Sequence, residues 1–143
     1  MDQIENLKVT ESCRDAICRF FYYLDEWRYD DMLRLMTKDA IWIRQGETLN
    51  GQLAIHAALN RRNAKQRIKH VITNLIVDQL QNRAASATSY LTSYKHDEAR
   101  DIEGAAQISG PFRLLLIQTS FVEAGGQWLI SKQVNVDQFH FIQ

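Results

Sequence analysis

The hydrophobic period of this chain changes after residue 68, and the change limits the folds that it can adopt. Before that point most apolar residues recur at three- and four-residue spacing, as in amphipathic helices. After it the chain is rich in β-branched and aromatic residues, the composition of long strands. Because 143 residues fit one domain with an adequate core, this order predicts a single α+β domain over residues 1–143.

Three helices are predicted before the strands, at about Thr10–Glu26, Tyr29–Met36 and Gln52–Asn60. Thr10 or Ser12 is expected to cap the first helix. Leu53 is expected to be buried by the third helix. A β-rich segment at 40–44 and a loop at 45–51 separate the second helix from the third.

Four long strands are predicted to follow, at His70–Asp78, Ala84–Lys95, Phe112–Val122 and Trp128–Phe141. The compact turn at 123–127 predicts an antiparallel hairpin between the last two. The polar, aperiodic segment 96–110 is expected to be a long, mobile connection. We expect the three helices to close a strongly bent antiparallel sheet into a cone, with an internal cavity for a small ligand.

One acid and one histidine stand in positions suited to chemistry. Asp25 ends the first predicted helix, and His70 opens the first long strand, where it is expected to share a face with Ile72, Asn74 and Ile76. If the two meet in a closed apolar pocket, the imidazole can act as general base and then acid, while the carboxylate orients it. A lone histidine on an apolar strand is also often a hydrogen-bonded core residue, and an Asp at a helix end is often solvated. Both interpretations remain open.

Other side chains are candidates for the same cavity. His96 follows a strand face rich in hydroxyl groups, and it is either a second acid or a solvated strand end. Trp42 and Arg44 share a strand face that could line the cavity or the protein surface. The side chains expected to contact a substrate are Phe21, Leu24, Trp42, Arg44 and Asn74.

Charge and composition exclude several classes of function. The 17 basic and 17 acidic residues balance, so no overall field attracts nucleic acid or anionic lipid. No apolar run is long enough to span a membrane, and a secretion signal is lacking, which favours a cytoplasmic protein. The basic cluster at 61–69 is interpreted as a solvated surface loop. The histidines lack metal-ligand spacing and there is no glycine-rich phosphate loop, so neither a metal nor a cofactor is expected.

Several of these segments together resemble a known family. The stretch Phe20–Trp42, the pair Asn50-Gly51, His70 with Asn74 four residues later, and a final hairpin with Gly126-Gln127-Trp128 are similar to the SnoaL-like branch of the nuclear-transport-factor-2-like superfamily. The resemblance implies the cystatin-like, cone-shaped α+β barrel fold of that superfamily. It identifies the activity poorly, because the superfamily holds enzymes, ligand binders and non-catalytic subunits.

Among the enzymes of the superfamily, scytalone dehydratase is the most similar in motif placement. Its helix Asp and its two strand histidines match Asp25, His70 and His96. The chain departs from that enzyme at Leu24 and Arg44, where the dehydratase has tyrosines. The resemblance therefore implies a cofactor-free dehydratase or isomerase, but not scytalone as its substrate.

Two other functions are consistent with the same residues. The segment 24–33 also resembles the small β subunit of aromatic-ring-hydroxylating dioxygenases, a structural partner of an iron-bearing large subunit. A ligand-binding protein without turnover is the third possibility. The favoured hypothesis is a homodimeric or homotrimeric lyase or isomerase that acts on a small, apolar or aromatic, oxygenated molecule.

Overall fold

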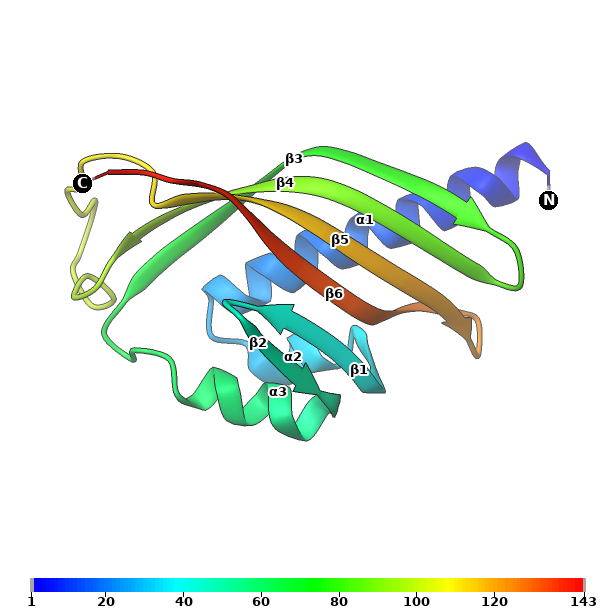
Figure 1. Ribbon diagram of the computed structural model, residues 1–143, viewed down its shortest axis with the longest axis horizontal. Helices are drawn as coiled ribbons and strands as arrows, with labels where there is room; N and C mark the ends of the chain where they lie inside the picture. The colour runs from blue at the N-terminus through cyan, green and yellow to red at the C-terminus, as the bar shows by residue number, and fades with distance from the viewer. Residues whose placement is uncertain (1, 143) are drawn as a thin grey trace.

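The computed structural model describes residues 2–142 and contains three helices and six strands (Figure 1). In chain order these are α1 (Gln3–Asp25), α2 (Tyr29–Leu33), β1 (Met36–Arg44), β2 (Glu47–Asn50), α3 (Gly51–Asn60), β3 (Arg67–Leu80), β4 (Ala84–His96), β5 (Arg113–Ala124) and β6 (Gln127–His140). The predicted α+β class is confirmed.

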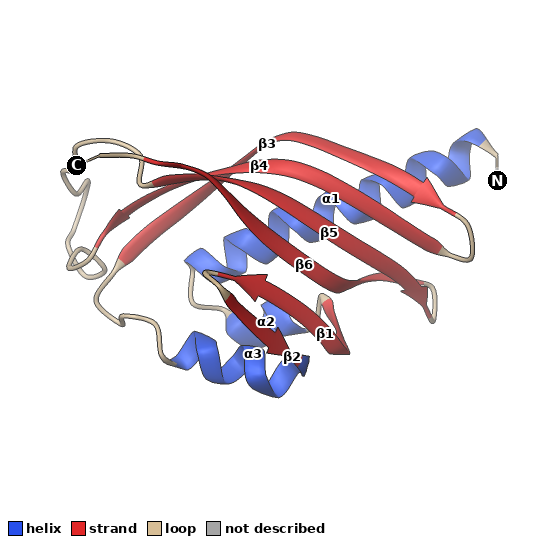
Figure 2. Ribbon diagram, viewed as in Figure 1, coloured by secondary structure: helices blue, strands red, loops and turns tan. Residues whose placement is uncertain are grey.

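All six strands form one curved sheet in the order β2-β1-β6-β5-β4-β3 (Figure 2). Neighbouring strands are antiparallel except β1 and β6, which are parallel. The outermost strands β2 and β3 do not pair with each other, so the sheet stays open and does not close into the expected barrel. The predicted final hairpin is confirmed: β5 and β6 are joined by Gly125 and Gly126, both with the positive φ that a tight two-residue turn requires.

Helix α1 begins two turns earlier than predicted. Asp2 caps it by accepting a hydrogen bond from the backbone N–H of Glu5 at 2.8 Å, so the predicted cap at Thr10 or Ser12 is wrong. Residues 3–8 of the added turns are exposed, Ile4 and Leu7 included, and only Val9 is buried, so the apolar period did not reveal them. Among the described residues, no helix combines the length and the apolar character needed to cross a bilayer.

Two further expectations fail, one in the segment before α3 and one in α3 itself. The predicted loop 45–51 contains the short strand β2, which pairs with β1. The side chain of Leu53, expected to be buried, is 90% exposed. Helix α3 instead turns Ile55, Ala58 and Leu59 into the core. Its position is also set by the Gln52 amide, which donates to the carbonyl oxygens of residues at the end of α2 and the start of β1.

A β-bulge in β3 changes which residues share a face. Asn74 and Leu75 together oppose one residue of β4, and Asn74 has φ 54°. Beyond the bulge the alternation is reversed, so Leu75 packs against the core while Ile76 is 59% exposed. The predicted common face of His70, Ile72, Asn74 and Ile76 is therefore wrong after Ile72.

The segment 96–110 is irregular beyond the end of β4 at His96, as expected, but it is anchored to the rest of the chain. Ala99 is completely buried. The Arg67 side chain donates hydrogen bonds to the carbonyl oxygens of Ile102 and Gly104. The backbone N–H of Arg100 donates to the carbonyl oxygen of Lys65 at 2.9 Å. These contacts hold the segment beside the start of β3.

The core lies between α1 and the sheet, and aromatic rings join the two. Phe20 of α1 meets Phe21 at 5.0 Å and Trp42 of β1 at 5.2 Å between ring centroids, both edge to face. The Trp42 indole N–H donates to the Asn135 side chain of β6 at 3.2 Å. This packing fixes the C-terminal end of α1 relative to the sheet.

The two cysteines of α1 are predicted to differ in reactivity. Cys13 is completely buried, and burial raises the pKa of its thiol to about 11, whereas Cys18 is exposed. Since the thiolate is the reactive form, iodoacetamide at about pH 8 should label only Cys18 in the folded protein and both cysteines in urea. Peptide mass spectrometry checks this result. Equal labelling rates in the folded protein would contradict the packing of α1.

Candidate functional site

Asp25 and His70 meet in the structure through two hydrogen bonds. The His70 ring nitrogen Nδ1 lies 2.5 Å from Asp25 Oδ1, and the His70 backbone N–H donates to Asp25 Oδ2 at 2.8 Å. The side chain of His70 is only 10% exposed, and that of Asp25 only 6%. The contact joins the end of α1 to β3, and both carboxylate oxygens are satisfied.

This geometry selects one form of the imidazole ring. Because a carboxylate oxygen accepts, Nδ1 must carry the proton that joins it to Asp25. In the neutral ring, Nε2 is then left with a lone pair. No residue within 2–142 forms a hydrogen bond with Nε2, and the ring borders a cavity. Phe21, with its ring centroid 5.5 Å away, packs against the imidazole.

The end of α1 explains how a carboxylate can stay at this position. The C-terminal end of a helix is negative and disfavours an acid. The chain leaves the helix through Trp27, which has φ 60°, and the Arg28 N–H donates to the Tyr23 carbonyl at 2.8 Å. Asp25 is thereby turned toward β3, where the two donors of His70 offset the unfavourable end of the helix.

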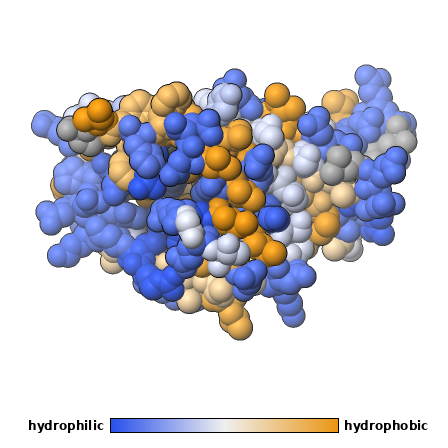
Figure 3. All heavy atoms as spheres, in the orientation of Figure 1, coloured by the Kyte–Doolittle hydropathy of each residue, from blue (hydrophilic) through white to orange (hydrophobic). Residues whose placement is uncertain are grey.

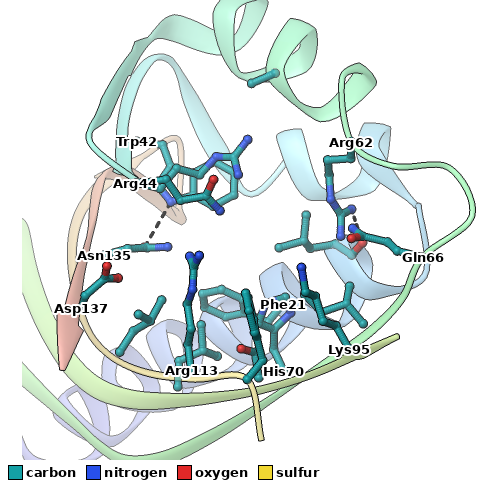
Figure 4. Close-up of a pocket in the computed structure, with 18 of the residues that line it drawn as sticks. Phe21, Trp42, Arg44, Arg62, Gln66, His70, Lys95, Arg113, Asn135 and Asp137 are labelled. Carbon is teal, nitrogen blue, oxygen red and sulfur yellow. Dashed lines mark hydrogen bonds between the residues drawn. The ribbon is translucent and has the colours of Figure 1, made fainter. Parts of the chain in front are cut away.

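The cavity beside His70 has a volume of about 410 Å³ and lies between the sheet and the segment that carries α3 (Figure 4). Hydrophilic side chains cover most of the end of the molecule where the segment 96–110 lies, on the left in Figure 3. Four of the five expected substrate contacts line the cavity, namely Phe21, Leu24, Trp42 and Arg44.

Asn74 and His96 do not line this cavity. Asn74 sits in the bulge of β3 and is exposed, because the extra residue turns its side chain outward. His96 ends β4, and its Nδ1 accepts a hydrogen bond from the Glu98 backbone N–H at 3.1 Å. His96 does end the strand, but it is half-buried and not the solvated residue of the alternative interpretation, and its role as a second acid stays a prediction.

Several lining residues were not predicted. Arg62 and Gln66 belong to the basic cluster interpreted as a surface loop, yet both border the cavity. Ser93, Lys95 and Arg113 also line it. Strand alternation contained the signal for the last three, because Ser93 and Lys95 share a strand face with the buried Leu91, and Arg113 shares one with Leu115.

The cavity is more cationic than the apolar pocket expected from the sequence. Its lining includes apolar side chains around the His70 ring, such as Phe21, Leu24 and Ile68. It also includes five cationic side chains and two acidic ones, namely Arg44, Arg61, Arg62, Lys95, Arg113, Glu47 and Asp137. The formal charges of these seven side chains sum to +3.

Burial and neighbouring charge both act on Arg44. Burial lowers the pKa of the Arg44 guanidinium from its ordinary value, and the positive charge of Arg62 lowers it further. Tyr29 lies near the same group, and burial raises the pKa of its hydroxyl although Arg62 opposes the rise. Within residues 2–142, no three His, Cys, Asp or Glu side chains are grouped so as to hold a metal ion.

Comparison with known proteins relates this chain to a family. The family model described as SnoaL-like domain matches residues 5–134. The comparison with curated protein sequences found no significant match.

Solved structures with the same fold come from Novosphingobium aromaticivorans, among other organisms. An NTF2-like protein with a cystatin-like fold has TM-score 0.74 and 18% identity, covering 93% of this chain and 84% of its own. A protein described as a candidate scytalone dehydratase has TM-score 0.74 and 15% identity, with coverages of 96% and 91%. The β subunit of a candidate aromatic-ring-hydroxylating dioxygenase has TM-score 0.75 and 12% identity, with coverages of 96% and 94%. At these identities the likeness concerns the fold alone.

Proposed function

The chain belongs to the SnoaL-like domain family, and from this premise we propose that it is a cofactor-free lyase or isomerase of the dehydratase type. Its substrate is a small, oxygenated, aromatic molecule that enters the cavity beside His70. The observation that carries the proposal is the pairing of Asp25 with both the ring and the backbone N–H of His70. This pairing leaves Nε2 available as a base at the cavity.

The reaction begins with proton abstraction. Nε2 of His70 takes a proton from the carbon next to the substrate carbonyl, and the electron pair of that C–H bond moves into the carbonyl as an enolate. The Asp25 carboxylate stabilises the imidazolium that forms. In the second step the enolate expels a hydroxyl group from the neighbouring carbon, and His70 returns the proton to it, so that water leaves and a C=C bond remains. In an isomerisation the proton returns to carbon instead.

The test uses two simple aryl ketones. In D₂O the protein should speed the exchange of the protons next to the carbonyl of α-tetralone, measured by mass spectrometry. It should also remove water from the α-tetralone whose hydroxyl group lies on the carbon β to the carbonyl, here called β-hydroxy-α-tetralone. The product is a naphthol, which is measured by fluorescence. His70→Ala should lower both rates by orders of magnitude, whereas His56→Ala should not, because His56 lies on α3 and is not among the residues that line this cavity. Rates equal to buffer with both ketones would contradict the proposal.

A second candidate function is that of a non-catalytic β subunit in a ring-hydroxylating dioxygenase. The fold likeness to such a subunit supports it. In that case the isolated chain should show no exchange activity, and it should co-purify with an iron-bearing large subunit from its source cells. The homodimer or homotrimer expected from the sequence stays a prediction.

A further inference from the structure

We propose that the substrate of this cavity carries a carboxylate, and that Arg44 and Arg113 bind it. The inference rests on the proposed function for the identity of the cavity as a substrate site, and it narrows the substrate to an aromatic carboxylic acid. Arg44 ends β1 and Arg113 begins β5. Figure 4 shows Arg113 extending into the cavity toward Arg44, which lies on the side of the cavity opposite His70.

The other charged side chains of the lining already bond to protein groups, Arg62 to two neutral oxygens and the rest to side chains of opposite charge or to His140. Arg61 pairs with Glu47 at 3.0 Å, and Lys95 lies 3.4 Å from Asp97. Arg62 donates to the Leu24 carbonyl at 3.0 Å and to the Tyr29 hydroxyl at 2.6 Å. Asp137, an acid of the lining, lies 3.0 Å from His140. No carboxylate within residues 2–142 lies at ion-pair distance from Arg44 or Arg113.

Arg44 is also left with an unused donor. Its Nε is buried and has no hydrogen-bond partner within residues 2–142. A buried N–H without a partner is costly, and a buried charge without a counterion more so. Burial and the positive charge of Arg62 lower the pKa of this guanidinium by more than the negative charge of Glu47 raises it. A ligand carboxylate would supply both the missing acceptor and the missing charge.

Aromatic rings hold both guanidinium groups in place. The Arg44 guanidinium lies over the Trp42 ring at 4.8 Å, and that of Arg113 lies over the Phe112 ring at 4.5 Å. A guanidinium stacked by its face keeps its N–H edge for a planar anion, and a carboxylate matches this edge with two parallel hydrogen bonds. The stacking therefore prepares the two arginines for a carboxylate.

The rest of the cavity suits an aromatic body. Phe21, Trp42 and Phe112 line it, with Leu91 and Leu115 on the sheet. A volume of about 410 Å³ accepts a fused-ring molecule. A carboxylate at Arg44 and Arg113 would direct the ring system of such a molecule toward His70.

Binding of a matched pair of probes tests the charge preference without turnover. Isothermal titration calorimetry with β-naphthoate and its neutral analogue β-naphthamide compares the same ring system with and without the anion. We expect the naphthoate to bind about tenfold more tightly or better, as charge-assisted hydrogen bonds predict. Arg113→Gln and Arg44→Gln should each remove most of this preference. Lys132→Gln, which removes an exposed positive charge outside the cavity, should keep it.

Three results would overturn the inference: equal affinities for the two probes, no naphthoate binding, or a preference that survives Arg113→Gln. Because Arg44 packs on Trp42, Arg44→Lys is added to retain the charge, and circular dichroism checks the fold of each variant. His70→Gln separates this inference from the proposed function. It should lose ketone exchange but keep the naphthoate preference, so failure of one hypothesis does not decide the other.

Discussion

Asp25→Asn is expected to lower turnover of β-hydroxy-α-tetralone by about 10²- to 10⁴-fold while the protein stays folded. The two carboxylate oxygens of Asp25 each accept a hydrogen bond from His70. An amide has only one oxygen. If that oxygen serves the backbone N–H, the amide NH₂ faces Nδ1 and forces the ring proton onto Nε2, where it prevents His70 from acting as a base.

The adjacent residue provides a matched control. Glu26→Gln makes the same carboxylate-to-amide change one position later, on an exposed side chain that pairs with Lys69 outside the cavity lining. Its turnover should stay within about twofold of the parent, since exposed ion pairs contribute little. Steady-state kinetics measures both variants. Similar losses in the two variants would indicate a general structural effect and would contradict the proposed role of Asp25.

The double variant Asp25→Asn/His70→Gln adds a stricter expectation. If the two residues act as one unit, its turnover should be about as low as that of His70→Gln alone. Independent contributions would instead multiply. A multiplied loss would show that Asp25 acts apart from the imidazole.

Phe20→Ala is expected to lower the free energy of unfolding by about 3–5 kcal/mol, a large part of what a domain of this size has. Phe20 is completely buried, and its ring touches both Phe21 and Trp42. Its loss leaves a cavity where α1 meets β1. Urea denaturation followed by circular dichroism measures the change.

Leu53→Ala is the matched control, because it also truncates an apolar side chain in a helix. Leu53 is 90% exposed, so the change should stay within about 0.5 kcal/mol. A loss of more than about 2 kcal/mol at Leu53 would contradict the orientation of α3. A loss below about 1 kcal/mol at Phe20 would contradict its position in the core.

The accuracy of the sequence-based expectations depended on how local their cause was. The hairpin with Gly125-Gly126 and the strand β4 follow from turn chemistry and from side-chain alternation, which act over a few residues. The loop predicted at 45–51 contains a second hairpin, because β2 pairs with β1 across the two-residue turn Gln45-Gly46, in which both residues have positive φ. The strand β2 has only four residues, of which Leu49 alone is buried, so alternation gave little indication of it.

The bulge of β3 shows the same limit within the candidate site. One extra residue at Asn74 reverses the alternation, so a position expected to contact substrate points outward. The cationic side of the cavity is a second case. Arg62, Lys95 and Arg113 come from three distant segments, and a balanced overall charge gave no indication that they would gather.

The sequence by itself determined the fold class, the order of the elements and the two residues, Asp25 and His70, most suited to proton transfer. These depend on local periodicity and on residue chemistry, which a sequence records directly. Only the tertiary structure decided that Asp25 and His70 touch, that Asn74 and His96 lie outside the cavity lining, and that Arg44 and Arg113 line it without a protein carboxylate at ion-pair distance in residues 2–142. Contacts between distant segments depend on strand register and on how the helices pack against the curved sheet, and these are set only when the whole chain folds.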